Sequence, residues 1–271
     1  MCNMVNDLLA VDNSNFQQFD DRVSFGMQFG QGYLSSSLAP VLGAQDQTAT
    51  TNSNNFNYNS LSIEVEKLFD VGIWFDVQIA NLNSYSQSNF TPNPLGNFQY
   101  IADVKAKIGY NFQLLSNLAL TPYLLVGKSA NIGTINVGGG GLYGLSGQNG
   151  IAQDFYFNTG GGLRLEYIIN KYFDIYLDQF ASYNADQAPL STNSIFESEG
   201  LQGFGVIDTS NMQYTTTLGL KIDLWQDLQL GASLFYTNYN YGQPTLDFYN
   251  PGGGLATNEY GALLQVGWTF K

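Results

Sequence analysis

Thirteen charged residues recur at intervals along the chain, most of them between apolar neighbours, and they are the side chains that could do chemistry. They are Arg22, Glu64, Glu66, Asp76, Asp103, Lys105, Lys107, Arg164, Glu166, Asp174, Asp178, Lys221 and Asp223. Eight are acids and five are bases. Side chains of this kind inside a narrow barrel must pair with one another or meet water. They therefore predict either a salt-bridge plug or a water path whose excess acid favours cations.

The composition excludes several other kinds of chemistry. The 271 residues include no histidine, one cysteine and 22 acidic against 9 basic residues. Without imidazole, a His-based catalytic centre or metal site is ruled out. One cysteine allows neither an internal disulfide nor a Cys-cluster metal site. A net charge of −13 argues against nucleic-acid binding. We expect no cofactor, no resident metal and no enzymatic activity.

The elements that must position these charges are strands, because apolar residues recur with a period of two. Val71, Ile73 and Phe75 alternate with Gly72 and Trp74, for example. Ten segments follow this pattern: 22–38, 56–69, 71–85, 98–112, 118–131, 153–168, 171–185, 211–224, 228–242 and 257–270. Each is long enough for a tilted strand that crosses a bilayer, roughly 9–11 residues in the hydrocarbon.

The connections between the segments alternate in length. Short turns are expected at 69–70, 111–117, 169–170 and 225–227, and long polar loops at 39–55, 86–97, 132–152, 186–210 and 243–256. Short turns at one side and long loops at the other are typical of bacterial outer-membrane barrels. We therefore predict an all-β fold, a ten-stranded antiparallel transmembrane barrel of up-and-down meander topology. Eight or twelve strands remain alternatives. Both termini are expected in the periplasm, with the long loops extracellular.

The placement of charges favours lipid outside the barrel. The thirteen charged residues all lie opposite the apolar face of their strands, and no charge falls in the middle of an apolar face. Lys67 and Lys128 are on the apolar side but at strand ends, where a long side chain can reach the interface. Aromatic residues flank the apolar bands, as Phe98 and Phe112 do. Such flanking girdles are typical of membrane barrels rather than soluble ones.

The last strand, 265–271, has alternating apolar and aromatic residues that end in Gly267, Trp268, Phe270 and a final Lys271. It resembles the terminal strand of bacterial outer-membrane β-barrel proteins, a broad class that includes opacity-type, outer-membrane-protein-A-like and small porin-like members. The resemblance covers residues 22–271. It implies an outer-membrane location in a Gram-negative envelope, contact with lipid and lipopolysaccharide, and recognition of Gly267, Trp268 and Phe270 by the barrel-assembly machinery. The ten-stranded omptin proteases use an Asp–His pair, which this chain cannot form.

Residues 1–21 precede the strands and are predicted to be a periplasmic or lumenal extension, either a short helix or a flexible tail. They lack the basic and apolar regions of a signal peptide, so we expect the signal to have been removed and Met1 added. Cys2 is either a free thiol or an acylated first residue, as in lipoproteins. A host-surface or envelope partner cannot be identified from the sequence.

Two functions remain open at this stage. The first is a narrow, cation-preferring channel for small solutes. The second is a closed barrel that acts as a structural anchor or presents its loops to a partner without transport. Pairing of Lys105 or Lys107 with Glu64, Glu66 or Asp76 would form the plug. Fold alone does not choose between the two functions.

Overall fold

The computed structural model describes residues 13–38, 50–85, 97–137, 148–186, 190–191, 206–207, 210–225, 227–241 and 256–270. One helix, α2 (Ser14–Asp20), precedes the strands β1 (Arg22–Leu38), β2 (Thr50–Leu68), β3 (Ile73–Tyr85), β4 (Asn97–Tyr110), β5 (Phe112–Leu115), β6 (Leu118–Val137), β7 (Gln148–Asn170), β8 (Phe173–Asp186), β9 (Leu190–Ser191), β10 (Val206–Ile207), β11 (Asn211–Trp225), β12 (Leu228–Tyr241) and β13 (Ala256–Thr269). Within these ranges no helix is long and apolar enough to span a bilayer.

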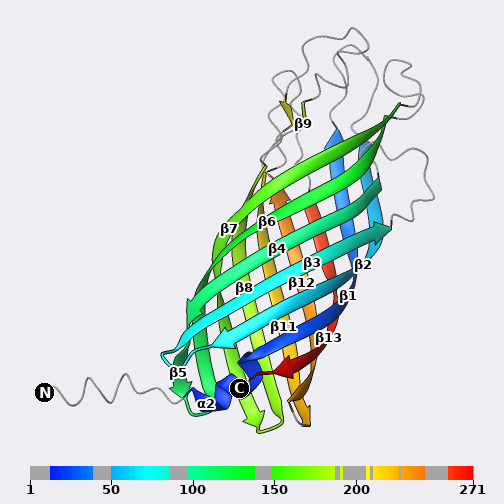
Figure 1. Cartoon of the computed structure of the whole chain (residues 1–271). Coiled ribbons are helices and arrows are strands. Elements are labelled where there is room, and N and C mark those ends of the chain that lie inside the picture. The colour runs from blue at the N-terminus through cyan, green and yellow to red at the C-terminus, as the bar shows by residue number, and fades with distance from the viewer. Residues whose placement is uncertain are drawn as a thin grey trace, which may run out of the picture.

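The strands form a closed antiparallel barrel (Figure 1). The ring runs β1, β2, β3, β4, β6, β7, β8, β11, β12, β13 and returns to β1 through the pairing of Arg22 with Thr269. β5 continues the line of β4 and also pairs with β6, and the short β9 and β10 pair with each other outside the ring. The prediction of a ten-stranded antiparallel barrel is confirmed.

The two ends of the barrel differ. Short connections join β2 to β3, β5 to β6, β7 to β8 and β11 to β12 at one end, which we call the short-turn end. α2 and the last described residues lie at this end (Figure 1). The opposite, long-connection end is where β6 and β7 continue past the predicted boundaries, to Val137 and from Gln148.

One predicted turn is partly wrong. Residues 111–117 were expected to be a turn, but Phe112–Leu115 forms β5. Asn111 lies between β4 and β5, where its backbone N–H donates to the carbonyl of Gly72 (2.8 Å) and its side chain donates to Thr121 (3.2 Å). These contacts allow the chain to resume pairing with β6 after one interruption, so the turn shortens to the residues between β5 and β6.

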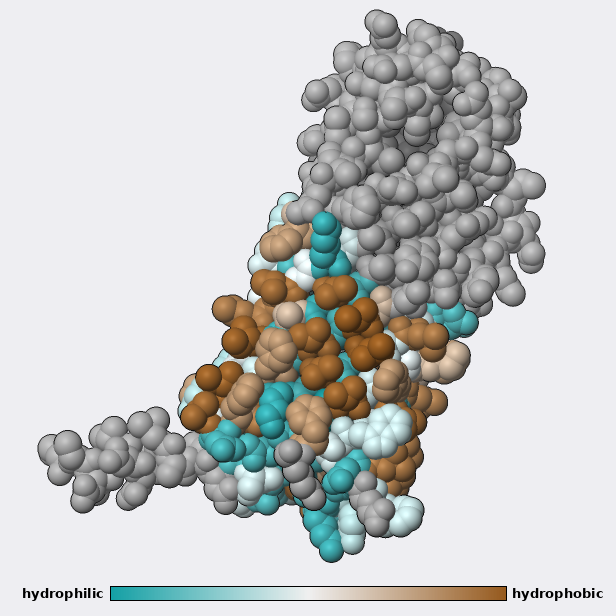
Figure 2. All heavy atoms as spheres, viewed as in Figure 1, coloured by the Kyte–Doolittle hydropathy of each residue, from teal (hydrophilic) through white to brown (hydrophobic). Residues whose placement is uncertain are grey.

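The outer wall is apolar and bordered by aromatic residues. Large exposed apolar side chains cover its middle, including Leu61, Ile79, Leu124, Leu218, Leu234 and Leu264. Figure 2 shows hydrophobic residues gathered over the middle of one face, with more hydrophilic residues lower in the view, toward the short-turn end. Toward the long-connection end lie Phe157, Tyr183, Tyr214, Tyr236 and Tyr260, and toward the short-turn end lie Phe69, Phe112, Tyr172, Trp225 and Trp268. This is the arrangement of a barrel wall that faces a bilayer between two aromatic girdles.

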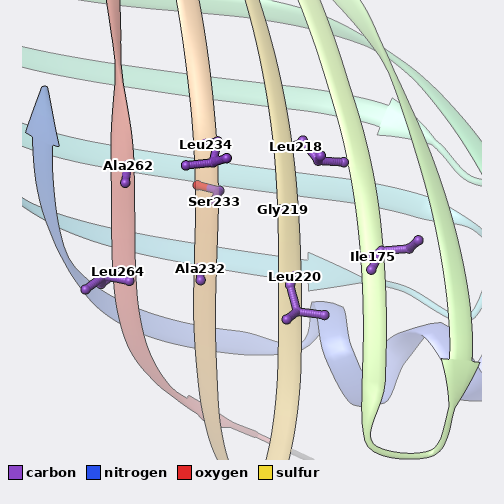
Figure 3. Close-up of a pocket in the computed structure, with 9 residues that line it drawn as sticks. All are labelled: Ile175, Leu218, Gly219, Leu220, Ala232, Ser233, Leu234, Ala262 and Leu264. Atoms are coloured by element: carbon purple, nitrogen blue, oxygen red, sulfur yellow. The ribbon is translucent and has the colours of Figure 1, made fainter. Parts of the chain in front are cut away.

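A shallow groove of about 430 Å³ crosses this outer wall over β8, β11, β12 and β13 (Figure 3). Ala232 and Ala262 are its small outward residues, between the larger side chains of Leu218, Leu234 and Leu264. Its lining is almost entirely apolar, so the groove suits hydrocarbon and lies outside the polar interior described next.

Candidate functional site: the barrel interior

The interior near the short-turn end contains a group of eight charged residues, which we call the inner charge cluster. Its members are Asp20, Arg22, Glu64, Glu66, Arg164, Glu166, Asp174 and Lys221. Asp20, Glu66, Asp174 and Lys221 have no exposed surface, and Arg22, Arg164 and Glu166 are also buried. The period-two alternation explains why they meet, because on each strand it turns the charged side inward and the apolar side to lipid.

Glu66 is the centre of this cluster. Its carboxylate contacts three cations, namely Arg22 (3.0 Å), Arg164 (2.7 Å) and Lys221 (3.1 Å). It also accepts a hydrogen bond from the indole N–H of Trp74 (3.0 Å). One carboxylate therefore holds together side chains from β1, β3, β7 and β11.

Two of these ion pairs cross the bore. The ring order places β7 four strands from β2 in one direction, through β3, β4 and β6, and β11 four strands from β2 in the other, through β1, β13 and β12. The Glu66–Arg164 and Glu66–Lys221 pairs thus join strands on nearly opposite sides of the barrel. Side chains of the wall close the lumen at this level.

α2 fills the mouth below the cluster. Phe16 and Phe19 are fully buried in one apolar cluster with inward-facing residues of β2, β3, β6 and β7, namely Leu68, Trp74, Ala119, Tyr123, Leu125 and Ile168. Asp20, at the last position of α2, forms ion pairs with Lys221 and with Arg164 (3.4 Å). The helix therefore adds an apolar layer and one further carboxylate to the interior.

A second group lies around Lys107 on β4. Its ammonium contacts Asp76 on the neighbouring β3 (3.2 Å) and Asp178 on β8, three strands away (3.0 Å). Asp178 also accepts a hydrogen bond from the Tyr123 hydroxyl. Asp76 and Asp178 have almost no exposed surface, so this second group, too, spans part of the bore.

Farther along β8, β11 and β12, toward the long-connection end, the inward side chains are neutral and polar. Asn184 donates to Asn211 (2.8 Å), Gln213 donates to Thr215 (3.1 Å), and the Thr215 and Thr237 hydroxyls lie 3.0 Å apart. All five residues are buried. Their hydrogen bonds to one another satisfy polar groups that are shielded from water.

The structure distributes the predicted charged residues among these groups in a way that only partly follows the predicted pairings. Lys107 pairs with Asp76, as one of the predicted alternatives had it, but Lys105 pairs with Asp103 on its own strand (2.6 Å). Glu64 contacts Arg22 (3.5 Å) instead of a β4 lysine. Asp223 lies near the end of β11, where its backbone N–H donates to the backbone carbonyl of Tyr172 (2.9 Å).

The residues predicted as an assembly signal lie where β13 meets β1 and α2. Trp268 faces outward with half of its surface exposed and packs edge-on against Phe25, ring centroids 6.3 Å apart. The Phe270 backbone N–H donates to the Asp21 carbonyl (3.0 Å). Gly267 is opposite Ser24 on β1. Cys2 and the rest of residues 1–12 of the predicted extension lie outside the described residues.

Sequence reasoning missed the contribution of α2. Phe16, Phe19 and Asp20 were included in the N-terminal extension without a role, although the three-residue spacing of the two phenylalanines places them on one helical face. Trp74 and Tyr123 were also overlooked. Trp74 occupies an inward position between outward apolar residues, which is the available signal that it packs inside the barrel.

The interior offers no metal centre within the described ranges, because no three acidic or sulfur side chains there are placed to hold an ion. The cluster is instead a network of direct ion pairs. Its chemistry is ion pairing across the bore, with more carboxyls than cations.

Comparisons with known proteins find other barrels at low similarity. No protein-family model matches the chain, and neither does any curated protein sequence. Among solved structures, the chain is similar to the outer-membrane protease OmpT from Escherichia coli (11% identity, 93% of this chain and 97% of that one, TM-score 0.47). It is also similar to the translocator domain of the autotransporter NalP from Neisseria meningitidis (10%, 99% and 96%, 0.47) and to a FadL homologue of Pseudomonas aeruginosa (11%, 97% and 96%, 0.38). These barrels have different roles, and identities this low say nothing about activity.

Proposed function

We propose that the chain is a bacterial outer-membrane barrel that is closed in this conformation, and that it acts as an anchor presenting its long connections on the cell surface. The observation that supports closure is the pair of ion contacts from Glu66 to Arg164 and Lys221 across the bore. α2 adds a second layer at the mouth. In this proposal the short-turn end faces the periplasm, and the protein is not an enzyme. The barrel contacts outer-membrane lipid and lipopolysaccharide and is assembled by the barrel machinery.

Conductance of the purified full-length chain in a planar bilayer, under a KCl gradient, tests closure. Because wall side chains meet across the lumen, we expect the wild-type barrel to give no steady current steps. Its heat-modifiable migration must first show that it is folded, since an unfolded sample is also silent. Steady steps from the folded wild-type barrel would contradict the closed state.

A matched pair of variants sharpens this test. Lys107→Ala removes a cation that bridges β3 and β8, whereas Lys105→Ala removes one paired on its own strand. If pairs that span the bore maintain closure, Lys107→Ala gives transient openings and Lys105→Ala stays silent. Equal behaviour of the two variants would show that bridging between strands is not what matters.

The narrow, cation-preferring channel is the second candidate, and the excess of interior acid favours it. The inner charge cluster has five carboxyls and three cations, and Lys107 contacts two carboxylates. An acidic lumen attracts cations wherever water enters. Steps with cation selectivity from the wild-type barrel would support this candidate and replace the closed anchor.

Presentation of the long connections has its own test. An epitope tag placed near residue 92, between β3 and β4, should be detected on intact cells, whereas the same tag near residue 116, between β5 and β6, should be detected only after the outer membrane is permeabilised. The reverse result would invert the proposed orientation.

A further inference from the structure

α2 lies in the short-turn mouth as a segment separate from the barrel wall. The Asp20 ion pairs and hydrogen bonds of Gln17 and Gln18 to the wall hold it there. Gln17 donates to the Asp70 carboxylate (2.7 Å) and to the Leu68 carbonyl (3.1 Å), and Gln229 donates to the Gln18 carbonyl (2.6 Å). Phe16 and Phe19 insert below them. The wall strands form a complete hydrogen-bonded ring without α2. The ring of strands therefore does not require the helix to be docked in the mouth.

Docking brings a carboxylate to a site that already has more acids than bases. The strands supply three cations to the inner charge cluster, Arg22, Arg164 and Lys221, and four carboxyls, Glu64, Glu66, Glu166 and Asp174. Asp20 of α2 is the fifth carboxyl, and it has no exposed surface. With α2 docked, five carboxyls share three cations, although Asp20 itself contacts Lys221 and Arg164. Surplus buried carboxylates of this kind are costly, and the usual response is to take up a proton.

The hydrogen-bonding pattern shows the same excess. Asp20 Oδ2, Glu166 Oε2 and both oxygens of Asp174 are buried, and no donor among the described residues reaches them. Glu66, by contrast, has a donor on each oxygen. Among the described residues, the cluster thus leaves four buried carboxyl oxygens without a donor, one of them on the residue that α2 contributes, and Arg164 Nε is also without a partner.

We propose that α2 docks into the mouth together with the uptake of a proton by the carboxyls of the inner charge cluster, to which Asp20 adds the surplus acid, so that α2 is a pH-sensitive stopper, retained at acidic pH and released as the pH rises. This inference concerns the mouth alone and does not depend on whether the lumen conducts.

The direction of the pH dependence follows from the groups that face Asp20. Burial raises the pKa of Asp20 well above its ordinary value, Glu166 and Glu66 raise it further, and Lys221 and Arg164 oppose the rise. The other charged or titratable groups of the cluster are Arg22 on β1, Glu64 on β2, and Asp174 and Tyr176 on β8. The inward groups of β12 and β13 nearby, Gln229 and Gln265, are neutral.

A carboxyl with a raised pKa when docked and an ordinary pKa when released binds its proton more tightly in the docked state. Docking is therefore strongest below the ordinary pKa of an aspartate. It weakens as the pH rises toward the higher pKa of the docked state.

The test is a distance measurement between two nitroxide labels on the full-length chain in lipid nanodiscs. Cys2→Ser removes the natural thiol, and Asn15→Cys on α2 and Tyr172→Cys on the β7–β8 turn carry the labels; both positions are exposed. We expect a narrow distance peak at about pH 5 and its reversible loss at about pH 9. The same narrow peak at both pH values would overturn the proposal.

Variants of two adjacent residues, Asp20 and Asp21, identify the acid that makes docking depend on pH. Asp20→Asn imitates the protonated carboxyl, so it should keep the narrow peak at both pH values. Asp21→Asn removes the acid that pairs with Lys67 at the rim, and it should keep the pH response of the parent. A pH response that survives in Asp20→Asn would also overturn the proposal. If Asp20→Asn fails to fold, the pH series of the parent and of Asp21→Asn still decide whether docking depends on pH.

Discussion

Glu66 shows how one buried carboxylate can hold a barrel interior together. It pairs with Arg22, Arg164 and Lys221 and accepts a hydrogen bond from Trp74. A buried ion pair is weak evidence for net stability, since desolvation offsets much of the attraction. Removal of one partner is different, because it leaves the others charged and unpaired.

Glu66→Gln should therefore lower the free energy of unfolding by roughly 3–5 kcal/mol. The measurement is urea-induced unfolding in lipid vesicles, followed by tryptophan fluorescence. Glu64→Gln is the matched control, because Glu64 lies two residues away on β2, contacts one cation, Arg22 (3.5 Å), and otherwise accepts a hydrogen bond from the neutral Gln265. A similar loss for both variants would show that the three-cation geometry of Glu66 has no special role.

The sequence predicts which face each charge takes but not its partner. Alternation alone places Glu66 and Arg164 opposite the apolar faces of their strands. Their contact joins residues 98 positions apart and depends on how the strands tilt and stagger around the ring. That geometry belongs to the closed barrel as a whole. This is why predictions based on neighbouring strands found Lys107 with Asp76 and missed the pairs of Glu66.

Among the strands, aromatic rings covering glycines fix part of the interior packing. Gly219 on β11 is directly opposite Tyr176 on β8, and Gly162 on β7 is opposite Tyr123 on β6. At either glycine an added Cβ would overlap the ring. The missing side chain lets Tyr176 lie flat, where its ring also stacks on the Arg164 guanidinium, 4.4 Å from the ring centroid.

Gly219→Ala should consequently destabilise the barrel by about 1–3 kcal/mol, the usual cost of overpacking. Urea unfolding in vesicles measures the loss, and Tyr176→Leu in the same chain should recover part of it by removing the ring. Gly231→Ala on β12 is the control, because its new methyl would meet flexible side chains and no ring, namely Gln265 (Oε1 at 2.9 Å and Cβ at 3.2 Å) and Arg22 (3.5 Å). Equal effects at the two glycines would argue against the ring as the cause.

The strands were predictable because the period-two alternation of apolar residues is repeated ten times. The elements that the prediction did not place, α2 and β5, are short. α2 has seven residues, too few for a strong helical period, and it is held by the barrel rather than by its own propensity. β5 was missed for a related reason. Asn111 interrupts the strand, and the continuation of pairing depends on contacts with Gly72 and Thr121 from other parts of the chain.

At the scale of the whole molecule, the distribution of apolar and charged side chains is the reverse of that in a soluble protein. The barrel's most exposed side chains include Leu124, Leu218 and Leu234, while nearly all described charges of the strands point inward. Such a wall is stable only where hydrocarbon replaces water as the neighbour. The aromatic girdle toward the long-connection end borders the apolar part of the wall. There the Tyr260 hydroxyl donates to Gln31 (2.8 Å), a polar residue on the outer face of β1.

A charge placed on this wall should consequently have a cost that depends on its depth. Leu234 lies in the middle of the apolar zone and is 63% exposed. Leu234→Arg should lower the free energy of unfolding in vesicles by about 2–4 kcal/mol, while Gln31→Arg at the girdle should cost about 0–1 kcal/mol. Because both sites face outward, packing inside the barrel is unchanged in each variant. The difference therefore measures the depth of the surrounding lipid, and equal, small costs would mean that water, not hydrocarbon, surrounds this barrel.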